Sequence, residues 1–323
     1  MTLSKQQLSL LPSHNLFFTP NKLKPIVINK NLSVIISAPV KAPFAFDSLI
    51  LSISAKLQKD AAILLQAAVE TEKGWSGFYK LAYISNTYKK TFEPQKDEFA
   101  STDIDTLLCK KPANRFKYQI TILGKAKINL LCAALTNSTA FYDKELAQET
   151  LDLKDFELPL APISQMEFED KTIANKICSP AALTAVLNYY GKKVNLADII
   201  KAVYDENAKI YGTWPLNTAV AAQTGLNACV VRCSSLAQAE GEIYKGRPVI
   251  VSIGFKKGKL KNAPQQATAG HLVVITGFDK KGDVIVIDPA AKTAKDARRV
   301  YSRAQFAEAW LKNKKGLTYA IED

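Results

Sequence analysis

Histidine is scarce in this chain of 323 residues, which contains only His14 and His271. The five cysteines include no CxxC pair, and the CxxxC pair of Cys229 and Cys233 has no histidine nearby. Because a zinc site needs several closely spaced Cys or His ligands, the sequence argues against one. An odd number of cysteines in a chain of this length also argues against a disulfide framework.

Long apolar runs are absent as well. None approaches the ~18–20 residues that span a bilayer, so no transmembrane segment is expected. The first 45 residues lack the ordered basic, apolar and small-residue regions of a signal peptide, which favours a cytoplasmic location. We expect residues 1–44, with His14 in an unstructured tail, to form an N-terminal extension that is in part poorly ordered. The apolar stretch 32–40 within it resembles a strand.

Basic residues are in excess, with 43 Lys and Arg against 30 Asp and Glu. The excess is spread over both halves, since residues 1–160 carry a net charge of +5 and residues 161–323 a net charge of +8. Nucleic-acid binders usually concentrate their charge and favour Arg for base readout, so we expect no specific nucleic-acid site. A solvated basic surface that favours anionic envelopes or acidic polymers is the better interpretation. The densest clusters are short, namely Lys256, Lys257, Lys259, Lys261 and Lys312, Lys314, Lys315.

Residues 45–150 contain short segments that alternate apolar and polar residues or run continuously apolar, with turn residues between them. Several such segments in succession predict an antiparallel β-sandwich. This half has no histidine and no convergent acidic pair, so we expect a binding or packing module. Trp75 and Tyr79 are interpreted as core residues, with an aromatic ligand platform as the alternative.

A domain boundary is predicted at 150–162, an extended stretch with two prolines that follows a helix-like segment. Beyond it, residues 158–323 are predicted to form an α+β domain, because helices come first and an antiparallel sheet follows. The predicted helices cover 178–191, 194–205, 215–225, 235–246 and 302–312, and the predicted strands cover 248–255, 271–278, 283–288 and 317–321.

Cys178 stands at the start of the first of these helices, which has Pro180 in its first turn and Gly191 at its end. The unpaired N–H groups at a helix N-terminus give it a partial positive charge, which favours thiolate over thiol. The alternative is a small buried hydrophobic residue. Two further residues, His271 and Asp288, favour the nucleophile.

His271 opens one predicted strand, and Asp288 ends the next. If Phe278 pairs with Asp283 across the turn, Val273 pairs with Asp288, and His271 lies on the same face because side chains alternate with period two. His271 and Asp288 are then diagonal neighbours within reach of a hydrogen bond. A cysteine at a helix start, a histidine at a strand start and a carboxylate at a strand end form a candidate catalytic set.

The second half of the chain resembles the papain-like cysteine peptidases of the C39 type, in particular the stand-alone C39-like proteins of bacteria. The resemblance covers nearly all of residues 160–323 and is looser for the β-rich module before them. It rests on the segments ISQM (163–166), CSPAALTAVLNYYG (178–191), GTWPLNTAVAAQTGL (212–226), GHLVVITGF (270–278), VIDPAA (286–291) and RRVYSRAQFAEAWL (298–311).

The resemblance implies a role for each candidate residue. Cys178 would be the nucleophile, His271 the general base and later acid, and Asp288 the residue that orients the imidazole. Gln165 would donate a hydrogen bond to the oxyanion beside the Cys178 backbone N–H, with Asn175 as a second candidate. Together these would hydrolyse a peptide bond through a thioester, with no metal or organic cofactor.

Several questions stay open at this point. Trp214 lines the cleft in one interpretation and belongs to the core in the other. The substrate would be a peptide or a peptidoglycan-like molecule, and relatives of this type are often exported, against the cytoplasmic expectation above. Amide transfer by the same triad, an inactive papain-like domain whose sandwich binds a polymer or peptide, and a leader-peptide processing domain are the alternatives to hydrolysis.

Overall fold

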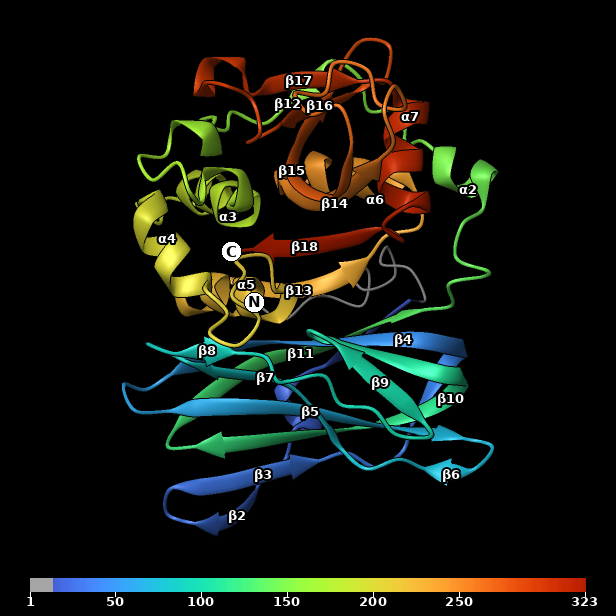
Figure 1. Cartoon of the computed structure of the whole chain (residues 1–323), viewed down its shortest axis with the longest axis vertical. Coiled ribbons are helices and arrows are strands. Elements are labelled where there is room, and N and C mark those ends of the chain that lie inside the picture. Colours follow the sequence, from blue (N-terminus) through green and yellow to red (C-terminus); the bar gives the residue numbers. More distant parts are fainter. Residues whose placement is uncertain (1–13) are drawn as a thin grey trace.

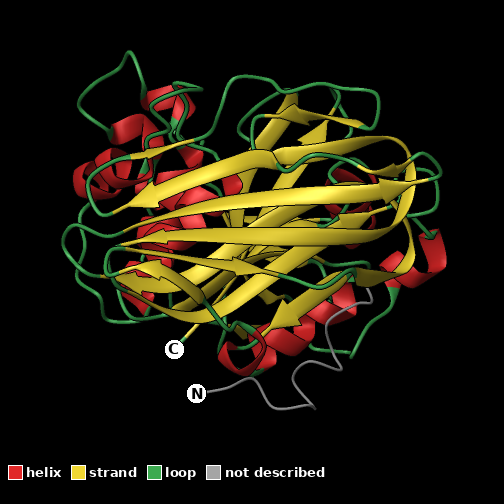
Figure 2. Ribbon diagram, turned by 90° about the horizontal axis from the view of Figure 1, so that it is seen from below, coloured by secondary structure: helices red, strands yellow, loops and turns green. Residues whose placement is uncertain are grey.

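The computed structural model describes residues 14–323 and contains two antiparallel sheets (Figure 1). The N-terminal sheet lies at the bottom of Figure 1, and the helices and strands of the C-terminal half lie above it. Viewed from below in Figure 2, the long strands of the N-terminal sheet cover the lower face, and the helices lie behind them and at their margins. None of the helices described is long and apolar enough to cross a membrane.

The N-terminal sheet has eleven strands with the order β1-β11-β4-β10-β5-β7-β8, and β2, β3, β6 and β9 pair off this path. The strands are β1 (Asn15–Phe18), β2 (Ile26–Asn29), β3 (Leu32–Ile36), β4 (Val40–Leu57), β5 (Ala62–Thr71), β6 (Gly74–Trp75), β7 (Tyr79–Ser85), β8 (Lys89–Lys90), β9 (Ala100–Asp103), β10 (Thr106–Leu123) and β11 (Ala126–Thr136). A 3-10 helix (Pro20–Lys22) follows β1, and the short helix α2 (Lys144–Gln148) follows β11.

The antiparallel character predicted for this half is confirmed, whereas its arrangement as a sandwich stays a prediction. Hydrogen bonds join all eleven strands into one sheet. The strands β4 and β10 have 18 residues each, and their register shifts between Leu108 and Ala113 and again before Arg115. Such irregularities bend a strand, so β10 can pair with β4, β9, β5 and β3 along its length.

The segment expected to be an N-terminal extension contributes strands to this sheet. Its apolar stretch forms β3, which pairs with β10, and β1 pairs with β11. His14 does not lie in an unstructured tail: its ring packs against Phe44 and Phe141, with ring centroids 4.9 and 4.6 Å apart. Burial, followed by the positive charge of Arg232, lowers the pKa of His14 to about 4. The remainder of the predicted extension, residues 1–13, lies outside the described residues.

The C-terminal sheet has the order β13-β18-β14-β15-β16-β17, with the short β12 paired to β15. The strands are β12 (Phe156–Glu157), β13 (Asn227–Arg232), β14 (Val249–Phe255), β15 (Thr268–Phe278), β16 (Val284–Ile287), β17 (Arg298–Tyr301) and β18 (Leu317–Glu322). The α-helices are α3 (Cys178–Tyr189), α4 (Leu196–Val203), α5 (Trp214–Gln223), α6 (Leu236–Tyr244) and α7 (Arg303–Ala307). Short 3-10 helices cover Gln165–Glu167, Ala174–Lys176 and Ala294–Asp296, and a π-helical turn covers Glu308–Lys312.

All predicted helices and strands of this half are present; most have shorter bounds than predicted, but α5 and β15 begin earlier and β18 ends later. The strands β13 and β17 were not predicted, and the last helix continues as a π-helical turn. The short β12 approaches β15 at Gly277, where a Cβ atom would lie 2.1 Å from the Phe156 carbonyl oxygen. Only glycine allows this contact, which ties the segment between the two halves to the second sheet.

The two halves share a buried interface in which β4 and β11 face β13 and α5. Ser52 Oγ accepts a hydrogen bond from the Val230 N–H (2.8 Å), and Cys132 Sγ lies 3.2 Å from the Val230 carbonyl oxygen. Leu216 and Ala219 of α5 belong to the apolar core of the N-terminal sheet. Because side chains of each half complete the core of the other, the halves pack as one body.

Candidate active site

Cys178 is the first residue of α3, and its side chain is partly exposed. Nine residues of this helix are buried, from Ser179 to Leu187, so packing on nearly all sides fixes its position. The first N–H groups of a helix have no acceptor within it and form its positive end. The sulfur of Cys178 is therefore held where a helix favours negative charge.

His271 lies on β15, whose pairing with β16 is regular near the site and shifted near the turn. The observed partners are Val274 with Ile287 and Ile275 with Val286, which is the register that the sequence predicts at this end. At the turn, Phe278 pairs with Val284 instead of Asp283, and a bulge between Ile275 and Gly277 absorbs the extra residue. The predicted pairing was wrong at the turn only.

The structure brings His271 and Asp288 together as predicted. His271 Nε2 lies 2.7 Å from Asp288 Oδ1, and the two residues are 2 % and 1 % exposed. Asp288 also accepts hydrogen bonds from the Tyr301 hydroxyl (2.6 Å) and the Ala290 N–H (2.9 Å). The Cys178 side chain interacts with the His271 ring, and this interaction affects the pKa of both groups. Since Nε2 faces Asp288, Nδ1 is the ring nitrogen available to the sulfur.

The charges of these three groups stabilise one another. Burial favours a neutral His271, but the charge and hydrogen bond of Asp288 raise the pKa of the ring well above its usual value. Burial likewise raises the pKa of Cys178, yet the His271 hydrogen bond and charge, followed by the Leu272 N–H, bring it below the usual value for a thiol. The pKa of Asp288 is lowered because the effects of His271 and Tyr301 outweigh its burial. The site therefore favours a thiolate–imidazolium pair.

Gln165 lies beside this group and is buried, at 1 % exposure. Its backbone N–H donates to the Pro289 carbonyl oxygen (2.9 Å), so the segment that carries it is attached to the residue after Asp288. Its Nε2 donates to the Ala174 carbonyl oxygen (2.8 Å), and its Oε1 is buried without a hydrogen-bond partner among the described residues. Asn175, the second candidate, is exposed.

Trp214 is half-buried at the start of α5 and has no hydrogen bond to the three central residues. Its ring contacts Tyr319 edge-on (5.3 Å between centroids), and its backbone N–H donates to Asp105 Oδ2 of the N-terminal half (2.6 Å). The Tyr319 hydroxyl in turn lies 3.0 Å from Ser179 Oγ, next to Cys178. Trp214 is thus connected to the site through Tyr319 and Ser179.

Residues 157–317 match the model of the Peptidase_C39 like family. The chain belongs to the peptidase C39-like family through its C-terminal half. This C39-like domain has the cysteine-peptidase fold that the sequence resemblance predicts. No curated protein matches the chain.

Three solved structures are similar to the C39-like domain. A double glycine motif protease from an AMS/PCAT transporter, in complex with its leader peptide, is 20% identical, with coverage of 53% of this chain and 96% of that chain and a TM-score of 0.35. The peptidase domain of Streptococcus ComA, a bifunctional ABC transporter of a quorum-sensing pathway, is 16% identical (50% and 96% coverage, TM-score 0.34). A protein described as a C39-like peptidase from Bacillus anthracis is 16% identical (52% and 99% coverage, TM-score 0.39).

Further residues around the site were not singled out from the sequence. Tyr301, on the unpredicted strand β17, donates to Asp288. Ser179 Oγ donates to Asn217 Oδ1 (2.9 Å) and so joins the Cys178 helix to α5. Tyr301 and Asn217 both lie in segments that carry the family resemblance, but only the strand order and helix packing reveal their partners.

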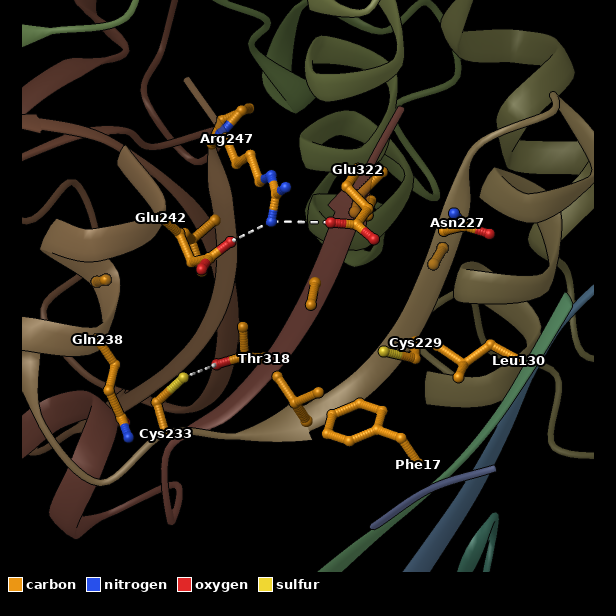
Figure 3. Close-up of a pocket in the computed structure, with 17 residues that line it drawn as sticks. Phe17, Leu130, Asn227, Cys229, Cys233, Gln238, Glu242, Arg247, Thr318 and Glu322 are labelled. Atoms are coloured by element: carbon orange, nitrogen blue, oxygen red, sulfur yellow. Dashed lines mark hydrogen bonds and ion pairs between the residues drawn. The ribbon is translucent and has the colours of Figure 1, made fainter. Parts of the chain in front are cut away.

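A small cavity of the C39-like domain lies away from this site, between β13, β18, α6 and the N-terminal sheet (Figure 3). Arg247 stands between Glu242 and Glu322 at one end, at 3.3 and 2.8 Å, and Phe17 and Cys229 lie toward the other. The cavity offers about 50 Å³ and is lined mainly by apolar groups. This is room for a few waters at most, so the cavity is a gap in the packing of the interface.

Proposed function

We propose that this chain is a cysteine peptidase or amidase that hydrolyses a peptide bond with the triad Cys178, His271 and Asp288. The proposal rests on one observation above all. A partly exposed thiol at a helix start interacts with a buried imidazole that lowers its pKa, and the imidazole is itself hydrogen-bonded to a buried carboxylate. A structural histidine–aspartate pair needs no thiol at its other nitrogen, whereas a nucleophile and its base need this contact.

The reaction follows from the charges of the three groups. The Cys178 thiolate attacks the carbonyl carbon, and the His271 imidazolium gives its proton to the nitrogen as the C–N bond breaks. The amine leaves, and the acyl group stays on sulfur as a thioester. Neutral His271 then takes a proton from water as the water oxygen attacks, and the C–S bond breaks to release the acid and restore the ion pair.

The negative oxygen of each tetrahedral intermediate needs donors. We propose that the Cys178 backbone N–H, free at the helix start, supplies one. Gln165 is the better candidate for the second because it is buried beside the site, whereas Asn175 is exposed. One N–H of the Gln165 amide is used by Ala174, and the other is available to the oxyanion.

Asp288 and Tyr301 act on His271 in this proposal. The carboxylate holds the ring with Nδ1 toward the sulfur, and the Tyr301 hydroxyl holds the carboxylate. Peptides or peptidoglycan-like molecules are the proposed substrates. We propose that Trp214 supports the wall of the cleft, since its ring packs edge-on against Tyr319.

The test measures how fast each of the five cysteines reacts with iodoacetamide near neutral pH, with mass spectrometry of the labelled peptides. We expect Cys178 to react first. Cys109 is the internal control because it is also partly exposed, while burial raises its pKa to about 12. Replacing His271→Ala should slow Cys178 and leave Cys109 unchanged. Equal rates at Cys178 and Cys109, or no effect of the histidine change, would overturn the proposal.

Product analysis separates hydrolysis from amide transfer. With a peptide substrate and an added amine, hydrolysis yields the free acid, whereas transfer yields a new amide. We expect the free acid, and a predominant amide product would reassign the reaction to transfer.

A further inference from the structure

The two lysine clusters that stand out in the sequence meet at one hollow of the C39-like domain. Lys256 and Lys259 come from the loop after β14, and Lys312 and Lys314 come from the end of the last helical segment. The hollow between them has a volume of about 420 Å³. Residues far apart in the sequence, four lysines among them, thus line one open space.

These charges are poorly compensated. The only acidic residue lining the hollow is Glu308, which pairs with Lys312 at 3.6 Å. Lys256 and Lys259 have no ion-pair partner within residues 14–323, and Lys314 donates to the Ala269 carbonyl oxygen (3.0 Å).

A fifth positive charge lies behind the hollow. Arg232 is buried, and its Nη1 donates to the Lys315 carbonyl oxygen (3.0 Å). Burial, followed by the charge of Arg232, lowers the pKa of Lys314. Converging positive charges with few acidic partners attract an anion.

The hollow adjoins the strand that carries the predicted general base. Thr268 and Ala269, the first residues of β15, line it, and His271 follows two residues after Ala269. The ammonium group of Lys314 is bonded to this stretch of backbone. A chain bound in the hollow therefore lies along the end of β15 that carries His271, on the face of the strand toward Gly270 and opposite to the His271 side chain.

We propose that this hollow binds an acidic segment of the peptide substrate, at a distance from the bond that is cleaved. This inference rests on the proposed function. Four separate ammonium groups suit separate carboxylates, since Lys acts as a point charge, whereas nucleic-acid sites commonly use Arg and exposed aromatic rings. The one aromatic residue of the lining, Phe255, is buried.

Binding is tested with Cys178→Ala, in which a peptide stays intact. The probe is a fluorescent Gly-Ser peptide with a tetraglutamate segment, compared by anisotropy with a peptide in which glutamine replaces each glutamate. We expect the acidic peptide to bind and the glutamine peptide to bind at least about tenfold more weakly. The double change Lys256→Ala and Lys259→Ala should weaken binding of the acidic peptide by about tenfold. The matched control removes two exposed lysines of the N-terminal half, Lys24→Ala and Lys30→Ala, and should change little.

Equal binding in the two lysine double variants would overturn the inference. So would tighter binding of a single-stranded oligonucleotide than of the acidic peptide at the same salt concentration, which would reassign the hollow to nucleic acid. Inorganic phosphate is also used as a competitor at the same total charge as unlabelled acidic peptide. If phosphate displaces the labelled peptide as strongly as the unlabelled peptide does, the hollow is a simple anion site and the inference is overturned.

A second measurement joins the hollow to Cys178 in the wild-type chain. The same peptides carry a chloroacetyl group and a Gly-Ser spacer of graded length, with a reach of about 3.3 Å per residue. The acidic peptide should alkylate Cys178 faster than the glutamine peptide, and the Lys256/Lys259 variant should abolish the difference. Binding without this acceleration would overturn the substrate role. Failure of the proposed function would instead appear as an unreactive Cys178 toward free iodoacetamide while peptide binding persists.

Discussion

Replacing Asp288→Asn tests whether the carboxylate sets the charge of the whole site. The side chain keeps its size, so the Ala290 N–H retains an acceptor, but His271 loses its negative partner at 2.7 Å. Since burial alone disfavours the imidazolium, the pKa of His271 should fall. A hydrogen bond to a charged group contributes about 1.5–3 kcal/mol, and one pKa unit corresponds to 1.36 kcal/mol, so the fall should be about one to two units.

The lower pKa of His271 in this variant also affects the Cys178 thiol. Cys178 owes its lowered pKa to the His271 hydrogen bond and charge, and both weaken when the ring is neutral. Loss of the Asp288 charge acts in the opposite direction, because that charge raises the pKa of Cys178, but it is the smallest of the influences. The net result should be a higher thiol pKa.

The assay is the iodoacetamide rate at Cys178 from about pH 4 to about pH 9, since the thiolate is the reactive form. In the wild-type chain the rate should rise at low pH and reach a plateau early. In Asp288→Asn the rise should move up by about one unit or more. Tyr301→Phe, which keeps the carboxylate and removes one hydrogen bond to it, should move the rise by less. An unchanged profile in a folded Asp288→Asn variant would refute the reasoning.

Three further predictions concern other parts of the chain. Gln165→Ala should reduce turnover of an activated ester by about 10²–10³ while the iodoacetamide rate at Cys178 stays unchanged. Asn175→Ala should leave both the turnover and the iodoacetamide rate unchanged. Burial raises the pKa of Asp105 to about 7, above its unfolded value of about 3.9, so the folded chain binds the extra proton and stability falls as pH rises between these values. Between about pH 4 and pH 8 the wild-type chain should therefore lose about 2–4 kcal/mol more free energy of unfolding, measured with urea, than Asp105→Asn does. Equal changes in the two chains would contradict this prediction. Gly277→Ala should lower the free energy of unfolding by about 1–3 kcal/mol, whereas Gly212→Ala, where a Cβ meets nothing within 4 Å, should not.

The centre of the candidate site could be predicted because local rules govern it. A helix start with an early proline fixes Cys178, and the period of two along a strand places His271 and Asp288 on one face. The bulge between Ile275 and Gly277 was not foreseen, since it depends on how the turn and the neighbouring β12 pack. The shifted register at the turn left the site end unaffected.

Contacts between residues far apart in the chain could not be predicted, because no local sequence pattern identifies the partners. Tyr301 reaches Asp288 only once β17 pairs with β16. The His14 ring packs against Phe44 of β4 and against Phe141 in the loop between β11 and α2, so contacts with distant residues hold a segment whose own sequence signals are weak. The single N-terminal sheet depends likewise on irregular pairing of β10 with β4, which alternation of apolar residues does not reveal.

The N-terminal sheet contributes to the site by holding α5 in place. Asp105, in the turn after β9, accepts the backbone N–H of Trp214 and so caps the first turn of this helix. One turn later, Asn217 accepts from Ser179, the neighbour of Cys178. Since Leu216 of the same helix belongs to the core of the sheet, the position of the Cys178 helix depends on packing in both halves. We infer that the N-terminal half is a structural part of the candidate active site, which a separately tethered binding module would not be.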